Sequence, residues 1–144
     1  MTPNAYNLLL ATLCMVLLTF IVGIRMLYSR VQEMRQKRLH PQKVATAKLM
    51  AANLENVQAA DNFRNLFETP VLFYALVACA IAASYVPLWL VIGAWCYLGL
   101  RVVHSIIHCT YNNVMHRLAV FALSFVLLVV LWVCFVLSFP KGVL

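Results

Sequence analysis

The sequence predicts an all-α integral membrane protein in which four spanning helices form a bundle. Composition is the first observation behind this prediction: 65% of the residues are hydrophobic, 10% are charged and the mean hydropathy is +0.90. Soluble domains are about half apolar and a quarter charged. The second observation is that apolar runs near the roughly 20 residues that a spanning helix needs recur along the chain. We expect one domain over residues 1–144.

Positive charge is concentrated in one segment of the chain. The formal net charge is +7, and eight of the eleven Lys and Arg residues lie between Arg25 and Arg64. Cytoplasmic loops of membrane proteins contain such an excess of Lys and Arg, and basic segments there also contact anionic lipids. No basic-aromatic module for RNA or DNA is visible. We therefore interpret the charge as a topology signal, with membrane lipids as partners and no nucleic acid.

The first predicted span runs from about Ala5 to Tyr28. Its centre is uncharged, and Arg25 is the first charged residue, placed where a long cationic side chain can extend toward the headgroups. No basic residue precedes the apolar run and no small-residue cleavage site accompanies it, so we expect a retained span and not a signal peptide. A polar connection interrupted by Pro41 follows.

The second helix is expected to begin in water. The segment from Val44 to Asp61 is rich in good helix formers, and it leads into the membrane near Asn62. Pro70 lies about two turns further along, where it lacks the N–H that a helix interior requires. We expect the proline to leave a backbone carbonyl available in this polar region.

A long uncharged run then extends over 32 residues, from Thr69 to Leu100, with a predicted turn at Ser84–Pro87. Two spans and a turn need roughly 44 residues, so both helices must extend into their charged flanks. Ionisable groups at that depth are costly unless they pair or face water, and they are functional candidates by default. The flanks contribute Arg64, Asn65 and Glu68 before the run and Arg101 after it.

The third span is predicted from about Pro87 to Cys109 and the fourth from about Arg117 to Phe139, joined by Tyr111–His116. The basic first connection should be cytoplasmic, so four spans place both termini on the opposite side. The ends of spans one and three and the starts of spans two and four then share the cytoplasmic face. We expect their polar residues to converge there.

The converging side chains suit a small ligand with both anionic and cationic groups. Four of them have the i, i+3, i+7, i+10 spacing of a single helical face: Arg101, His104, His108 and Tyr111. Arginine offers forked donors to carboxylates, whereas a glutamate accepts hydrogen bonds from an ammonium group. An arginine beside a thiol also lowers the pKa of the thiol and favours the thiolate.

Structural interpretations of the same residues remain open. Arg64 and Glu68 are i, i+4 neighbours and could form an ion pair within one helix. Arg101 and Arg117 could be ordinary positive-inside residues at helix ends. Each interpretation is reasonable for a single residue, but the gathering of all these residues at one depth favours a site.

A zinc site is a further alternative. His104 and His108 lie at i, i+4, and Glu68 or His116 could reach them in the folded chain. Zinc sites need three or four protein ligands, and no third ligand here has a matching spacing. We therefore predict no metal.

Two motifs are similar to those of one known family. Arg64–Glu68 reads R-N-L-F-E, and Arg101–His104 reads R-V-V-H, with Arg117 sixteen residues after Arg101. The first resembles the R-N-x-x-E signature of the MAPEG family, the membrane-associated proteins of eicosanoid and glutathione metabolism. The second resembles the third-helix motif and fourth-helix arginine of its microsomal prostaglandin E synthase branch. The similarity extends from about Asn62 to Phe121, and Asn65–Tyr74 is most similar to the bacterial members.

The resemblance implies a homotrimer of four-helix protomers in a bacterial inner membrane, with glutathione bound between neighbours near the cytoplasmic face. Arg117 is implied to stabilise the glutathione thiolate. Where catalytic branches have a tyrosine one turn after the histidine, this chain has His108, and Tyr111 lies one turn further on. The residues implied to bind glutathione are Arg30, by a looser match, and Arg64, Asn65, Glu68, Arg101 and His104, with His108 and Tyr111 at the tyrosine contact.

Three functions follow as hypotheses. The first is a glutathione-dependent transferase or peroxidase that acts on a lipophilic electrophile entering from the bilayer. The second is a non-catalytic lipid-binding or scaffold protein of the same fold. The third is a small transporter with Glu68 as its coupling carboxylate. Glu68 stands beside an arginine and near one membrane face, which argues against transport.

Overall fold

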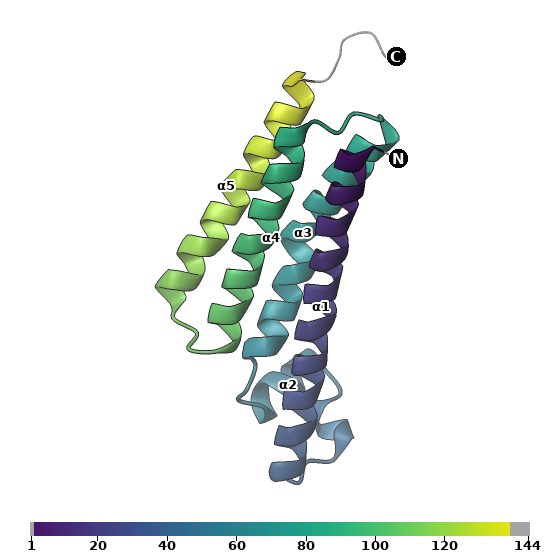
Figure 1. Cartoon of the computed structure of the whole chain (residues 1–144). Coiled ribbons are helices and arrows are strands. Elements are labelled where there is room, and N and C mark those ends of the chain that lie inside the picture. Colours follow the sequence, from purple (N-terminus) through teal and green to yellow (C-terminus); the bar gives the residue numbers. More distant parts are fainter. Residues whose placement is uncertain (1, 139–144) are drawn as a thin grey trace.

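The computed structural model describes residues 2–138, and within them the chain is helical throughout, without strands. Four of the described helices are long and apolar enough to cross a membrane, so the predicted all-α, four-span architecture is confirmed. Figure 1 shows them packed side by side, with the shorter α2 beyond one end of the bundle. The elements are α1 (Pro3–Gln36), η1 (Pro41–Val44), α2 (Ala47–Asn53), α3 (Gln58–Ala82), α4 (Leu88–Cys109) and α5 (Val114–Ser138).

Helix α1 is longer than the predicted span. It begins at Pro3, where the missing N–H of proline costs nothing, and it continues to Gln36. Arg25 Nη2 donates to the carbonyl of Cys109 at 2.6 Å, which places the end of α4 level with Arg25. The remaining residues of α1 therefore extend about 16 Å past the end of α4. The first part of the expected polar connection, up to Gln36, is therefore helical.

The connection between α1 and α3 folds back against this extension, and the expected continuous helix from Val44 into the second span is wrong. The buried carboxylate of Glu33 accepts the backbone N–H groups of Glu55 and Asn56, at 2.7 and 3.0 Å. These bonds hold the backbone in a non-helical path between α2 and α3. The helix therefore ends at Asn53 and begins again at Gln58.

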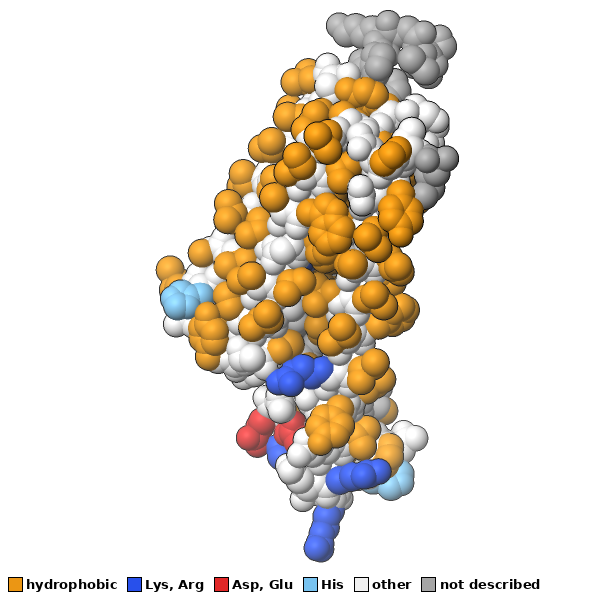
Figure 2. All heavy atoms as spheres, viewed as in Figure 1, with side chains coloured by type: hydrophobic (Ala, Val, Ile, Leu, Met, Phe, Trp, Pro, Cys, Tyr) orange, Lys and Arg blue, Asp and Glu red, His pale blue; other side chains and the backbone are white. Residues whose placement is uncertain are grey.

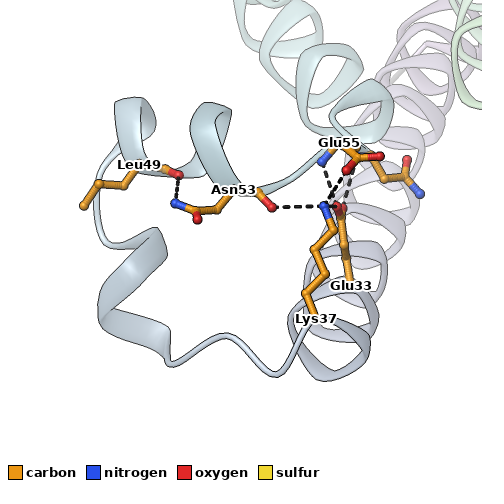
Figure 3. A network of polar contacts seen from close by, with 6 residues as sticks. Glu33, Lys37, Leu49, Asn53 and Glu55 are labelled. Carbon is orange, nitrogen blue, oxygen red and sulfur yellow. Dashed lines mark hydrogen bonds and ion pairs between the residues drawn. The ribbon is translucent and has the colours of Figure 1, made fainter.

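Lys37 joins the same network, as Figure 3 shows. Its Nζ lies 2.8 Å from the carboxylates of both Glu33 and Glu55, and it donates to the carbonyl of Asn53 at 3.1 Å. The hydrogen bond that Lys37 donates to Glu33, followed by the one that it donates to Glu55, raises the pKa of the Lys37 ammonium above its usual value. One cation thus ties the end of α1 to both sides of the break between α2 and α3.

The other helix boundaries lie close to the predicted ones. Pro87 precedes the first residue of α4, as expected of a proline at a helix start. Helix α5 begins at Val114, three residues before the predicted Arg117, because the Asn113 side chain caps its first N–H groups. The predicted end of the fourth span, Phe139, lies outside the described residues.

The core lies where the spanning helices meet. Helix α4 packs against α1 and α5, and α1 also packs against α3. The rings of Phe73 and Tyr97 stack at 5.0 Å in this core. Gly93 brings α4 close to α5, because a Cβ at this position would overlap the Leu131 side chain. The close packing of α4 explains why it is the most buried of the four spans.

Apolar and charged side chains are separated along the bundle axis. Figure 2 shows hydrophobic side chains over most of the visible face, whereas Lys, Arg, Asp and Glu gather toward the end where the α1–α3 connection lies. The turn between α4 and α5 lies toward that end, and the turn between α3 and α4 lies at the opposite one (Figure 1). The polar ends of the four spans therefore lie toward the same end of the bundle, as the charge distribution predicts.

Candidate functional site

Arg101 is at the centre of the polar cluster. Its side chain is fully buried at 0% exposure, and its Nη2 donates to the carbonyl of Asn65 at 2.9 Å. Its Nε and Nη1 have no hydrogen-bond partner, and within the described chain no carboxylate forms an ion pair with it. A buried cation left without a counterion costs several kcal/mol. Such a residue in a membrane span indicates a site for a ligand.

The contact of Arg101 with α3 lies next to the proline of that helix. Pro70 has no N–H, so the carbonyl of Leu66 lacks its usual helical donor. Arg101 donates to the carbonyl of Asn65, which directly precedes Leu66. The structure therefore places the arginine contact one residue away from the carbonyl that Pro70 is expected to free.

His104 and His108 extend the buried face of α4 toward its end. His104 Nδ1 lies 3.2 Å from the carbonyl of Arg117, and His108 Nε2 lies 3.3 Å from Nη1 of Arg117. A carbonyl only accepts and a guanidinium only donates, which assigns the tautomers: neutral His104 has its proton on Nδ1, and His108 has its proton on Nδ1 as well. The remaining His104 Nε2 and His108 Nδ1 are buried without partners.

The cluster is therefore poor in acids and rich in unpaired donors. Within the described chain, no three His, Cys, Asp or Glu side chains lie together as a metal site requires. In Arg101, His104 and His108, the unpaired atoms are two N–H positions of Arg101, one N–H of His108 and one acceptor nitrogen of His104. This set suits an anion that also brings a proton or a hydrogen-bond donor.

Arg117 lies in the first turn of α5 and is half-buried. Its Nη1 donates to Oδ1 of Asn112 at 3.0 Å and faces His108 at 3.3 Å. Both partners are neutral, so the charge of the guanidinium remains uncompensated. The partial positive charge of a helix N-terminus adds to the attraction for an anion here.

The predicted site residues on α3 lie at the border of the cluster. Arg64 and Glu68 are exposed and Asn65 is half-buried. The alternative of an intrahelical Arg64–Glu68 pair is not formed, because both ion pairs of the described chain involve Lys37. The side chains of Arg64 and Glu68 are therefore available to a ligand or to another protein chain.

Two predicted site residues lie apart from the cluster. Helix α4 ends at Cys109, so Tyr111 belongs to the following turn, where it is 61% exposed and contacts His116 Nδ1 at 3.3 Å. The expected helical face therefore stops at His108. Arg30 lies on the extension of α1 past the end of α4, and it forms no hydrogen bond with the cluster.

The sequence prediction missed the polar side chains that join α3 to α4 beside the site. Asn62 is fully buried, accepts a hydrogen bond from Ser105 at 3.4 Å and donates to the Cys109 sulfur at 3.4 Å. A signal was present, because Asn62 is in helical phase with the buried Leu66 and Phe73 of the same helix. The role of Asn112 had no such signal, since it lies in a turn.

The fold and the polar cluster define an integral, multi-pass membrane protein with a candidate anion site at one end of a four-helix bundle. The MAPEG family model matches residues 8–137, nearly the whole chain. The chain belongs to the MAPEG family, and membership indicates a glutathione-related transferase, peroxidase or related function. No curated protein and no solved structure matches the chain.

Proposed function

We propose that this protein is a glutathione-dependent membrane transferase or peroxidase that acts on a lipophilic electrophile, with its polar site facing the cytoplasm. The observation that supports the proposal is the buried Arg101, with two unpaired N–H positions, beside the half-buried and charge-uncompensated Arg117. The spacing of Arg101, His104 and Arg117 in the sequence is similar to that of the microsomal prostaglandin E synthase branch of the family.

The side chains of the cluster fit the groups of glutathione, which has two carboxylates, an ammonium group, two amides and a thiol. The unpaired N–H groups of Arg101 and His108 are donors for a carboxylate. Glu68 would accept from the ammonium group, and the Asn65 side chain matches a peptide amide. Arg64, which is exposed, is a second cation for the other carboxylate.

Glutathione, when bound, supplies the sulfur nucleophile. Arg117 would hold the sulfur as a thiolate, because a nearby cation lowers the pKa of a thiol from about 8.5. The unpaired Nε2 of His104 would accept a hydrogen bond from an N–H group of the same ligand. Each tenfold gain in the ratio of thiolate to thiol corresponds to about 1.4 kcal/mol of stabilisation.

An apolar groove supports the lipophilic nature of the second substrate. The groove lies between α1 and α3 and has a volume of about 430 Å³. It reaches Phe67, the direct neighbour of Glu68, so an apolar molecule from the bilayer could come close to the polar cluster. The same groove supports the second candidate, a non-catalytic lipid-binding protein. Its lining residues are Val16, Thr19, Phe20, Leu66, Phe67, Val71 and Tyr74.

A titration of the detergent-purified protein with glutathione separates the two candidates. We expect binding by calorimetry together with a rise in the ultraviolet absorbance of the thiolate at neutral pH. Arg117→Leu should abolish the rise while glutathione still binds through the residues of α3 and α4. Arg35→Leu, which removes an exposed cation on the extension of α1, is the matched control and should change neither signal.

Two outcomes would contradict the proposed enzyme. If glutathione does not bind, the glutathione-dependent function is wrong. If glutathione binds to the wild-type protein without a thiolate signal, and a chromogenic electrophile is not turned over, the lipid-binding candidate takes its place.

A further inference from the structure

The turn between α4 and α5 contains two adjacent asparagines with different hydrogen-bond partners. The side-chain oxygen of Asn113 accepts the backbone N–H groups of Met115 and His116, at 3.0 and 3.2 Å. Asn113 is therefore the cap of α5. The side-chain oxygen of Asn112 accepts from Nη1 of Arg117 at 3.0 Å. One asparagine thus serves the helix, and the other contacts a cation of the candidate site.

The backbone of Asn112 is held in the conformation that makes this contact. Its φ is 47°, in the left-handed region, and its N–H bonds to the carbonyl of Ile107 at 2.8 Å. Asparagine is one of the few residues other than glycine that adopt this region readily. The chain reverses direction here, which brings the residue after α4 next to the first turn of α5. Position 112 therefore requires a residue that adopts a positive φ, and separately its side chain contacts Arg117.

Arg117 is held by two neutral acceptors. Its Nη1 lies between Oδ1 of Asn112 at 3.0 Å and Nε2 of His108 at 3.3 Å. Within the described chain, its Nε and Nη2 have no hydrogen-bond partner. An acid at either position would orient the guanidinium equally well, but it would also compensate the charge. Neutral acceptors orient the cation and leave its charge available to an anion.

We infer that Asn112 is a positioning residue that orients Arg117 toward the ligand. The inference rests on the proposed function, because its consequence is a higher thiolate fraction of bound glutathione. A long side chain with several rotatable bonds loses this orientation when one of its anchors is removed. His108 alone, at the longer distance, would then hold the guanidinium.

The first test is Asn112→Gly, which accepts the positive φ without strain while it removes the acceptor. We expect the ratio of thiolate to thiol in bound glutathione to fall about tenfold, because a displaced guanidinium stabilises the thiolate less. Glutathione affinity should remain near the wild-type value. Asn113→Ala is the matched control: it should lower the melting temperature through loss of the cap, with an unchanged thiolate ratio per folded protein.

The second test is Asn112→Asp, which keeps both the turn and an acceptor oxygen in the same place. If the side chain of residue 112 does not face Arg117, this variant should keep a wild-type thiolate ratio. The positioning role predicts a fall, because a carboxylate beside Nη1 would compensate the charge of Arg117. If Asn112→Gly fails to fold, an unchanged thiolate ratio in Asn112→Asp would still contradict the contact between Asn112 and Arg117 on which the inference depends.

The outcomes separate this inference from the proposed function. A wild-type thiolate signal that either Asn112 variant leaves unchanged would overturn the positioning role alone. An equal fall in Asn112→Gly and Asn113→Ala would also overturn it, since the turn as a whole would then be responsible. A wild-type protein without a thiolate signal would overturn the proposed function, and the inference with it.

Discussion

Glu68 differs from the other glutamates of the described chain in having no basic partner. Glu33 and Glu55 share the ammonium group of Lys37, whereas Glu68 is exposed on α3 and forms no ion pair there. An unpaired carboxylate in a spanning helix is costly unless a ligand or a neighbouring chain pairs with it. Glu68 lies one helical turn after Arg64, so α3 exposes one positive and one negative side chain next to each other.

We therefore expect Glu68→Gln to weaken glutathione binding by about 1.5–3 kcal/mol, the range for hydrogen bonds to charged groups. Glutamine keeps the shape, and no ion pair is lost in the protomer, so the melting temperature should remain near that of the wild type. Calorimetric titration measures the first quantity and thermal unfolding in detergent the second. Unchanged affinity together with a lower melting temperature would assign Glu68 a structural role instead.

At the scale of elements, Glu33 decides the path of the chain between α1 and α3. It accepts two backbone N–H groups from the segment that joins α2 to α3, and it pairs with Lys37. Helix α3 contains Asn65 and Glu68, so the position of its start relative to α1 determines where these site residues lie. The buried carboxylate of Glu33, on the extension of α1, fixes that position through its two backbone hydrogen bonds.

Glu33→Gln should destabilise the folded connection by about 1.5–3 kcal/mol, because one backbone N–H then faces the side-chain NH2 of glutamine instead of a carboxylate oxygen. Limited trypsin digestion should cut faster after Lys43 and Lys48. Glu55→Gln is the matched control, because that side chain is 89% exposed and contacts only Lys37, so its ion pair contributes little. Equal digestion rates for the two variants would contradict the role of Glu33.

At the scale of the whole molecule, the basic connection determines the expected topology. Reporter fusions after Met50 and after Asn113 should both report the cytoplasm, and a fusion after Val86 should report the opposite side. In Figure 1, α2, which contains Met50, and the turn between α4 and α5 lie toward the same end of the bundle. A fusion after Asn113 that reports the far side would remove the reason for a cytoplasmic site.

The protomer also leaves polar groups that another chain could cover. Arg64 and Glu68 are exposed without ion pairs in the described chain, and Arg30 lies away from the cluster. We expect a homotrimer in which the Arg30 region of one protomer approaches the α3 residues of its neighbour. Native mass spectrometry or cross-linking in mild detergent measures the assembly. A stable monomer with full glutathione affinity would be evidence against a shared site.

The sequence by itself determined the fold class, the number of spans and most of the polar cluster. Hydropathy and charge are local properties of the sequence, so the four spans could be predicted without knowledge of any tertiary contact. The i, i+3, i+7 spacing of Arg101, His104 and His108 follows from helix geometry alone, and the structure buries all three. The R-N-x-x-E motif and Arg117 were recognised from their resemblance to the MAPEG family.

Tertiary structure decided the features in which residues distant in the sequence compete with local preference. The helix between α2 and α3 is broken because Glu33, more than 20 residues earlier, bonds to Glu55 and Asn56. Tyr111 leaves the buried face because the chain reverses at Asn112, whose side chain then reaches Arg117. Helix propensity acts between near neighbours and is worth less than about 1 kcal/mol per residue. Hydrogen bonds to a buried charge are stronger, and only the folded chain brings their partners together.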